Sequence, residues 1–226
     1  MTGSHHLTFI RRFFSRGQLL LFHKGDIILG NDPAPSGVYY IESGYVKIYA
    51  ISDNGDEYLH IIYGPGDVFP LTWAYVDAEP DSEFYEAIAD SRLRKVARAD
   101  FTHAMQSNPE LSYAMGIQLA YQFQVFLDRI DNLEYKKAAE RVVYHLLFLA
   151  HRFGVRHGSE ITIQAPITHE LFANSINLAR ETVSRQIEIL EKEQLVHNHR
   201  THMVIQDVPR LEHRLSHPSN IRNWGL

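Results

Sequence analysis

The sequence contains no cysteine among its 226 residues. Disulfide bonds, thiolate metal sites, cysteine-held iron–sulfur clusters and cysteine nucleophiles are therefore all excluded. A chain without disulfides also suits a reducing compartment, so we expect a cytoplasmic location.

Long hydrophobic runs are missing as well. The longest candidate, VVYHLLFLAHRF at 142–153, is interrupted by two histidines and an arginine. It falls short of the roughly 20 apolar residues that span a bilayer. The first residues lack the basic-then-apolar form of a signal peptide, and GSHH at 3–6 is typical of an expression-vector remnant. We expect no membrane partner.

An excess of positive charge is also absent, because the formal net charge is −5. The charges are unevenly distributed, however. Residues 1–135 contain 10 Lys and Arg against 18 Asp and Glu, whereas residues 136–226 contain 12 against 9 and hold 9 of the 14 histidines. This asymmetry indicates that the C-terminal part, with its net charge of +3, lies near a polyanion.

The region from Leu19 to about Val96 consists of short apolar runs separated by glycines. Val46, Ile48 and Ala50 alternate with more polar neighbours, as in half-buried strands. The turn signal DNG at 53–55 favours a hairpin. Many short strands at this spacing predict a small β-barrel or a jelly roll.

A long amphipathic helix is predicted over 108–135, which has no proline after Pro109. Its apolar face is wider than a small barrel can cover, so it is either a core helix or pairs with a second copy of the chain. We favour the pairing and therefore expect a homodimer. The residues expected at its interface are Leu111, Met115, Leu119, Phe123, Phe126, Ile130 and Leu133.

The remaining sequence predicts a winged helix-turn-helix. A helix over 136–153 ends at Gly154, where a C-cap glycine fits. A strand at 161–164, helices at 168–176 and 179–193, and strands at 195–199 and 202–207 follow. The chain is thus expected to be α+β, with a barrel domain at 1–107, a dimerisation helix at 108–135 and a DNA-binding domain at 136–226.

The helix at 179–193 has two different faces. Val183, Ile187 and Leu190 recur at helical intervals and predict a buried side. The other face begins with a cluster of four polar side chains: Arg180, Glu181, Ser184 and Arg185. A solvated surface is the simpler explanation for an isolated helix. Behind a helix and a tight turn, however, this face fits the DNA major groove, where arginine pairs with guanine and glutamate accepts from cytosine.

The segment RETVSRQIEILEKEQLV resembles the recognition-helix signature of the cyclic-AMP receptor protein/fumarate–nitrate regulator (CRP/FNR) family of bacterial transcription factors. FHKGDIIL, VYYIESGYVKIYA and GPGDVF resemble the cyclic-nucleotide-binding-like barrel of that family, so the resemblance covers nearly the whole chain. It implies double-stranded DNA and RNA polymerase as partners, with the four polar residues of the helix reading bases. The residues that it implies at the DNA backbone are Thr168, Thr182, His199 and Arg200.

Two positions depart from the family pattern. Asn177 stands where the turn usually has glycine, and asparagine tolerates a left-handed backbone better than other residues do. Ala179 stands where a small hydroxyl residue often caps the helix, and loss of that cap costs about 1 kcal/mol.

A cyclic nucleotide is not expected in the barrel. In nucleotide-binding relatives, the stretch after the GPGDVF-like turn supplies a glutamate for the ribose and an arginine–serine pair for the phosphate. Here no lysine or arginine occurs from Val68 to Ser91, and Asp81 falls at the arginine position, where a carboxylate repels phosphate.

The sequence predicts no cofactor and identifies no effector-binding residue. Haem on His23, His60 or His103 is a minor alternative. The aromatic side chains of the barrel either line a pocket for an apolar or aromatic ligand or, as we favour, pack within strands. They are Tyr39, Tyr40, Tyr45, Tyr49, Tyr58, Tyr63, Trp73, Tyr75 and Tyr85.

Other functions receive less support from the sequence. His197, His199 and His202 suggest a metal site, but no acidic residue lies in their hairpin before Asp207. A cupin-like enzyme needs a close histidine pair with a carboxylate, and no nucleophile–base pattern is present. We therefore expect neither a metal site nor an enzyme. A winged helix that binds protein instead of DNA remains an alternative.

Overall fold

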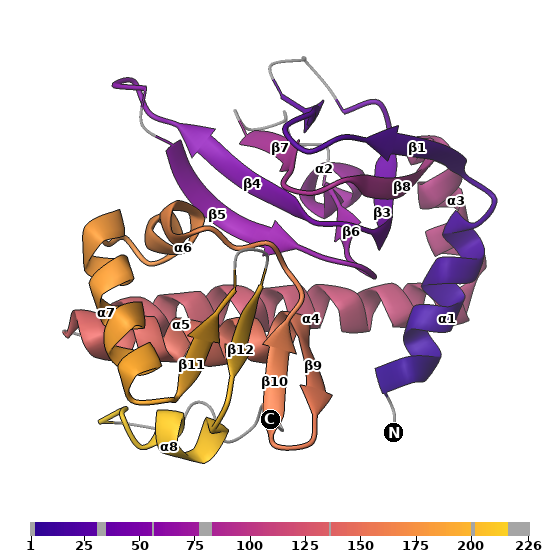
Figure 1. The fold of residues 1–226 in the computed structure, drawn as a ribbon. Helices are drawn as coiled ribbons and strands as arrows, with labels where there is room; N and C mark the ends of the chain where they lie inside the picture. Colours follow the sequence, from indigo (N-terminus) through magenta and orange to yellow (C-terminus); the bar gives the residue numbers. More distant parts are fainter. Residues whose placement is uncertain are drawn as a thin grey trace. The chain divides into compact units, whose positions relative to one another are not determined.

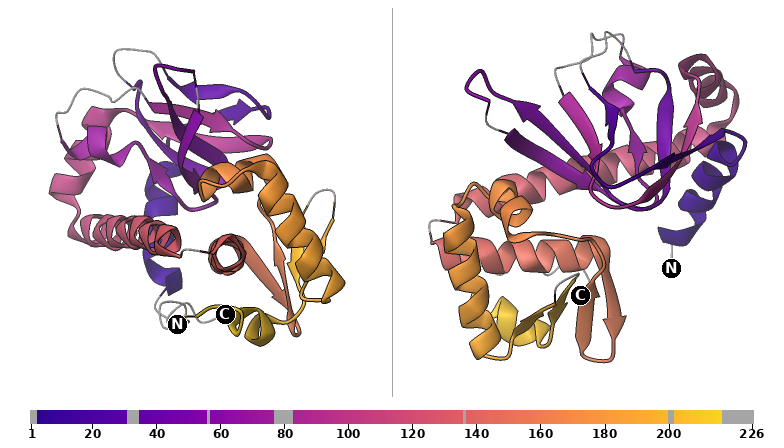
Figure 2. Two further views of the ribbon diagram at one scale, coloured as in Figure 1. Left: turned by 90° about the vertical axis from the view of Figure 1, so that its left-hand side faces the viewer. Right: turned by 45° about the horizontal axis from the view of Figure 1, so that its top comes forward.

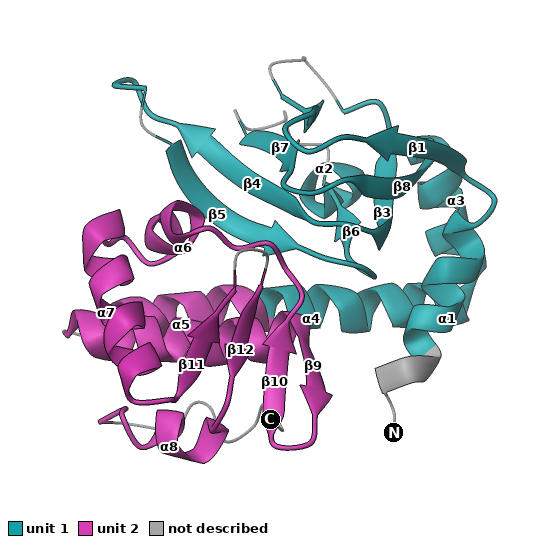
Figure 3. Ribbon diagram, viewed as in Figure 1, with its two compact units in different colours: residues 1–123 teal, residues 124–226 magenta. Residues whose placement is uncertain are grey.

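Residues 3–30, 35–55, 57–76, 83–135, 137–199 and 202–216 are described by the structure, a computed structural model, with the side chains of residues 3–5 left out. The chain forms two units, residues 1–123 and 124–226 (Figure 3). The sequence suggested a separate helix at 108–135. In the structure this helix, α4 (Pro109–Glu134), belongs to both units, since the division falls within it.

The first unit contains two antiparallel four-stranded sheets, as expected for a jelly roll (Figure 1). They remain separate sheets in the described residues and do not close into one barrel. One has the order β1 (Gln18–Phe22), β8 (Ser91–Val96), β3 (Val38–Ser43), β6 (Val68–Phe69). The other has the order β2 (Ile27–Leu29), β7 (Glu83–Ala87), β4 (Val46–Ile51), β5 (Glu57–Tyr63).

Aromatic rings from both sheets meet in the interior of the first unit. The ring centroid of Phe69 lies 5.5 Å from that of Tyr39, 5.1 Å from that of Tyr85 and 6.0 Å from that of Tyr63, each pair stacked. All four side chains are buried. These residues therefore form strand packing, which was the favoured interpretation of the aromatic pattern.

Three further helices cover the jelly roll: α1 (Gly3–Phe14), α2 (Leu71–Tyr75) and α3 (Arg98–Ser107). Ile10 and Phe14 of α1 are fully buried, and the Phe14 ring stacks on Tyr40 at 5.5 Å. The same core cluster includes Leu111 and Met115 at the start of α4.

This packing corrects the expected dimer surface. The side chains of Leu111 and Met115 are only 2% and 0% exposed, because their own chain already covers them. They have no apolar area to offer a second copy. The five expected residues farther along α4 keep exposed side chains: Leu119, Phe123, Phe126, Ile130 and Leu133.

The second unit is built around α5 (Ala138–Phe153), which contacts α7 (Arg180–Lys192), α8 (Val208–Glu212) and two strands (Figure 2). Its sheet has the order β11 (Val196–Asn198), β12 (Met203–Ile205), β10 (Glu160–Ile163), β9 (Gly154–His157). With α6 (His169–Ser175), these elements form the predicted winged helix-turn-helix. No helix in the described ranges has the length and apolar character needed to cross a membrane.

Gly154 is the C-cap residue of α5, as the sequence predicted, although its backbone is not left-handed. Its φ is −84°, and the chain continues directly into β9, a strand that the sequence did not predict. A Cβ at this position would overlap the carbonyl oxygen of Ala150. The glycine is therefore needed for close approach of two backbone segments rather than for a left-handed turn.

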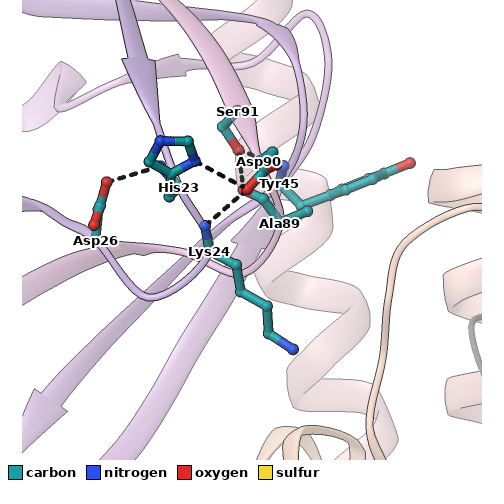
Figure 4. Close-up of polar contacts among 7 residues, drawn as sticks. All are labelled: His23, Lys24, Asp26, Tyr45, Ala89, Asp90 and Ser91. Carbon is teal, nitrogen blue, oxygen red and sulfur yellow. Dashed lines mark hydrogen bonds and ion pairs between the residues drawn. The ribbon is translucent and has the colours of Figure 1, made fainter.

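The turn between β3 and β4 depends on Gly44 and on Ser91, whose hydrogen bonds to Tyr45 and Ala89 are drawn in Figure 4. The Ser91 hydroxyl donates to the carbonyl of Ala89 at 2.7 Å and accepts from the backbone N–H of Tyr45 at 3.2 Å. Gly44 has φ +91°, and a Cβ there would overlap Ser91. Only glycine satisfies both conditions, the left-handed backbone and the absence of a side chain.

We predict that Gly44→Ala destabilises the first unit more than Gly55→Ala does. Gly55 also has a positive φ, of +87°, but a Cβ at this position would meet no described atom within 4 Å. Gly55→Ala should therefore cost only the left-handed backbone penalty of about 1 kcal/mol. Gly44→Ala adds the overlap and should cost about 1–3 kcal/mol more.

Urea unfolding measures both costs when it is followed by the fluorescence of Trp73, which lies in the first unit, in a Trp224→Phe background that removes the other tryptophan. Equal destabilisation by the two substitutions would contradict the role assigned to the contact with Ser91.

Candidate nucleic-acid interface

The orientation of α7 is fixed by its apolar face. Val183 and Ile187 are fully buried and Leu190 is 4% exposed, and α7 contacts both α5 and α6. Arg180, Glu181 and Arg185 lie on the other side and are exposed. The predicted contact face is therefore presented to solvent.

The turn between α6 and α7 tolerates the asparagine that replaces glycine. Asn177 has φ +53°, within the left-handed region that asparagine can adopt. The backbone N–H of Leu178 closes the turn by donating to Ala173 at 3.1 Å. The guanidinium of Arg141 donates to the carbonyl of Ile176 at 3.3 Å and so supports the turn from α5.

Ala179 is the N-cap residue of α7 and makes no side-chain cap, as the sequence indicated. At the start of α6, by contrast, Thr168 is a capping residue. Its hydroxyl oxygen accepts from the backbone N–H of Leu171 at 3.1 Å. Thr168 is exposed and Thr182, the third residue of α7, is half-buried, so both side chains are accessible to solvent.

Ser184 differs from the other three candidate base readers because it is half-buried and already hydrogen-bonded. Its Oγ lies 2.8 Å from Nδ1 of His169, and Nε2 of His169 lies 3.0 Å from Nδ2 of Asn198. The backbone N–H of Asn198 donates to Oε1 of Glu191 at 2.9 Å. His169 and Asn198 were not predicted, because they are 29 residues apart in the sequence and no spacing rule links them.

The wing places three histidines together. The ring centroid of His199 is 4.3 Å from that of His197 and 4.6 Å from that of His202. Desolvation and, after it, repulsion from positive charge on His197 and His202 lower the pKa of His199 below its ordinary value. In the described residues, these histidines included, no three His, Cys, Asp or Glu side chains are arranged so that they could hold one metal ion. Arg200 lies outside the described residues.

In the first unit, helix α4 is hydrogen-bonded directly to the turn that precedes β6. Asp67 accepts from the backbone N–H of Gly64 at 2.8 Å and from the side-chain amide of Gln118 at 3.0 Å. The amide of Gln122 donates to the carbonyl of Val68 at 3.1 Å. Asp67, Gln118 and Gln122 are all buried. Asp81, the residue expected to repel a phosphate, lies outside the described residues.

The three histidines considered as haem ligands have surface or polar surroundings. The side chain of His23 is 87% exposed and its Nδ1 lies 3.6 Å from Asp90 (Figure 4). His60 lies 3.1 Å from Glu83, and this hydrogen bond lowers the pKa of Glu83 against the opposing effect of burial. His103 is exposed on α3.

A cavity of about 590 Å³ is formed by residues of α1, β3 and the Pro65–Gly66 turn. Tyr40 lines it, whereas the adjacent residue Tyr39 contacts the aromatic interior. Because successive strand residues point to opposite faces, the cavity lies on the other side of β3 from that interior. The cavity is lined by two guanidiniums, of Arg11 and Arg92, and by the carboxylate of Glu42. Outside the lining, Nε of Arg94 lies 2.7 Å from Oε1 of Glu42 and forms an ion pair with it.

The chain thus consists of a jelly-roll unit followed by a winged helix-turn-helix unit. In the second unit, burial of one side of α7 leaves its opposite side, with two arginines, exposed. These features define the class of winged helix-turn-helix proteins that regulate transcription. Two family profiles agree with this assignment: the cyclic nucleotide-binding domain matches residues 19–108, and the Crp-like helix-turn-helix domain matches residues 140–214. The chain belongs to the CRP/FNR family of transcriptional regulators.

Similar proteins cover most of the chain. The nitrogen fixation regulation protein FixK of Azorhizobium caulinodans is 29% identical over 178 residues, which are 78% of this chain and 70% of that protein. The cAMP-activated global transcriptional regulator CRP of Haemophilus influenzae is 25% identical over 169 residues, 74% of this chain and 75% of that one. The solved structure of FixK2 from Bradyrhizobium japonicum shares the fold, with a TM-score of 0.75 and 22% identity over 89% of this chain and 98% of that chain.

Proposed function

We propose that this regulator binds a near-palindromic operator as a homodimer and that it does so without a cyclic nucleotide. The exposed face of α7 supports the proposed binding to an operator. Arg180 and Arg185 offer paired donors that match O6 and N7 of guanine, and Glu181 offers an acceptor for a cytosine amino group. No other described segment joins such side chains to a helix that is held in a helix-turn-helix.

The exposed apolar side chains of α4 support the dimer. Phe123, Phe126 and Ile130 are 65%, 40% and 56% exposed. Leu119 and Leu133 of the same helix also have exposed apolar side chains. Contiguous exposed apolar residues on one element favour a protein interface. Two recognition helices related by a two-fold axis then contact half-sites about 34 Å apart, one turn of DNA, so the operator has near two-fold symmetry.

Three observations support regulation without a cyclic nucleotide. Stacked rings of Tyr39, Phe69 and Tyr85 occupy the interior of the jelly roll. Gln118 joins α4 to Asp67 by a direct hydrogen bond of 3.0 Å. The segment from 68 to 91 also lacks the lysine or arginine that would balance a phosphate. For the same reasons, together with the exposed or paired histidines, we propose no haem.

The remaining parts of the proposal follow from binding at promoters. The protein acts in the cytoplasm, contacts RNA polymerase and catalyses no reaction.

If the winged helix bound protein instead, its affinity for DNA would be negligible. Operator binding should weaken steeply as salt rises, because contacted phosphates release counterions. A flat salt dependence would favour the protein-binding alternative.

We predict that Glu181→Ala lowers specificity more than affinity. A carboxylate beside DNA is repelled by every phosphate, and only acceptance from a base amino group offsets that repulsion. The operator is first selected from random duplexes with the wild-type protein. Binding curves on the operator and on a scrambled duplex, at one salt concentration, should then show a specificity ratio about 5- to 100-fold smaller, the range of one lost base contact.

Glu160→Ala is the matched control, since Glu160 is an exposed glutamate at the start of β10 in the same unit. It should leave the ratio unchanged. An unchanged ratio for Glu181→Ala as well would show that Glu181 reads no base.

We predict that Phe126→Glu converts the dimer to monomers, because it places a charge in the proposed apolar interface. Sedimentation velocity measures the change. Leu21→Glu is the control: Leu21 is 66% exposed on β1, which is not part of the proposed interface, and its replacement should leave the dimer intact. A dimeric Phe126→Glu variant would place the interface elsewhere.

We predict no saturable heat in calorimetric titrations with cyclic AMP or cyclic GMP at micromolar concentrations. Stacked aromatic rings lie in the jelly-roll interior, and the segment from 68 to 91 lacks a cation for the phosphate. Operator affinity should also be the same with and without either nucleotide. Tight binding of one of them would refute this part of the proposal.

A further inference from the structure

His169 joins three elements of the winged helix. It is the first residue of α6, its Nδ1 lies 2.8 Å from the Ser184 hydroxyl on α7, and its Nε2 lies 3.0 Å from the Asn198 amide nitrogen at the end of β11. All three residues are half-buried. This histidine is thus the meeting point of the first helix, the recognition helix and the wing.

The chemistry of the amide group determines the ring tautomer. The nitrogen of an asparagine amide only donates hydrogen bonds, so Nε2 of His169 must accept from Asn198 and carries no proton. The neutral ring then has its proton on Nδ1 and donates it to Oγ of Ser184. The direction of both hydrogen bonds follows.

This arrangement leaves Ser184 a donor. Its oxygen accepts from His169, so its own O–H is available for another partner, and donation to the oxygen polarises that O–H further. In the major groove, a donor is matched by O6 and N7 of guanine, O4 of thymine or N7 of adenine, and not by the amino groups of cytosine and adenine.

The same histidine restrains the wing. The backbone N–H of Asn198 is bonded to Glu191 in the last part of α7, while its side chain is bonded to His169 at the start of α6. The end of β11 is therefore attached to both helices, immediately before His199.

We propose that His169 is a positioning residue that makes Ser184 a hydrogen-bond donor to a base keto oxygen or N7 and fastens the wing to the recognition helix. The proposal rests on the proposed operator binding. It assigns the base preference of Ser184 to a side chain of another helix.

Two substitutions separate the two hydrogen bonds. The side-chain amide of asparagine reaches about as far as Nδ1 of histidine, so His169→Asn retains a donor for Ser184 and loses Asn198. The longer glutamine reaches about as far as Nε2, so His169→Gln retains an acceptor for Asn198 and loses Ser184. His213→Gln is the control, because His213 is an exposed histidine after α8 in the same unit.

The experiment measures affinities for the selected operator, for every single base-pair variant of one half-site and for a scrambled duplex. The base pair read by Ser184 is the one whose discrimination falls in Ser184→Ala. His169→Gln should lower discrimination at that same base pair by about three- to tenfold, the size of one hydrogen bond. Adding Ser184→Ala to His169→Gln should then have no further effect there.

His169→Asn should retain that discrimination and weaken binding to operator and scrambled duplexes alike, by about threefold, because the wing is released. Removing the acceptor atom that Ser184 contacts should abolish the effect of Ser184→Ala. The keto oxygen is removed with 2-aminopurine for guanine or 5-methyl-2-pyrimidinone for thymine, and N7 is removed with the 7-deaza purine. All variants should unfold at the temperature of the wild type to within a few degrees.

Different results contradict different statements. If the wild type does not distinguish operator from scrambled DNA, the proposed function itself fails. If it does, but His169→Gln keeps full discrimination at the Ser184 base pair, the positioning role is wrong. Equal losses on every duplex for both His169 variants would show a direct phosphate contact instead. An effect of Ser184→Ala that depends on a base amino group would refute the assigned donor.

Discussion

Burial of Val183, Ile187 and Leu190 determines what the recognition helix can contact. Each such side chain contributes about 1.5–3 kcal/mol when it is removed from water. Rotating α7 by one residue, about 100°, would expose this stripe and bury charged groups such as Arg180 or Glu181, at a further cost of several kcal/mol. The helix therefore has one orientation, and the polar face, the Asn177 turn and the attachment of the wing all depend on it.

Aromatic stacking and buried amide hydrogen bonds hold the first unit together. Phe69 stacks with rings from both sheets, and two buried glutamines of α4 are bonded to the turn at 64–68. A buried amide that lost its partner would cost about 1–3 kcal/mol. The position of α4 against the jelly roll is thus maintained by the chain's own groups.

Local patterns in the sequence predicted the strands from 38 to 51, the long helix and the two helices of the helix-turn-helix, because period and turn residues report local structure. They did not show what covers an apolar face. The spacing of Leu111 and Met115 is the same whether α1 or a second chain covers them, and α1 was not predicted. The pairing of His169 with Asn198 was likewise hidden, since it depends on how α6 and β11 meet.

The hydrogen bonds of His169 have a consequence for how such a regulator diverges after gene duplication. A residue on the exposed helix face that contacts only DNA can be substituted singly, and the operator preference then changes with it. Here a new residue at 184 also meets a ring nitrogen whose proton is fixed by Asn198. A residue that only donates would face the Nδ1–H with another hydrogen, so it requires compensating changes at 169 and 198. The three positions are therefore linked by contact, and a regulator with a new target is expected to change them together.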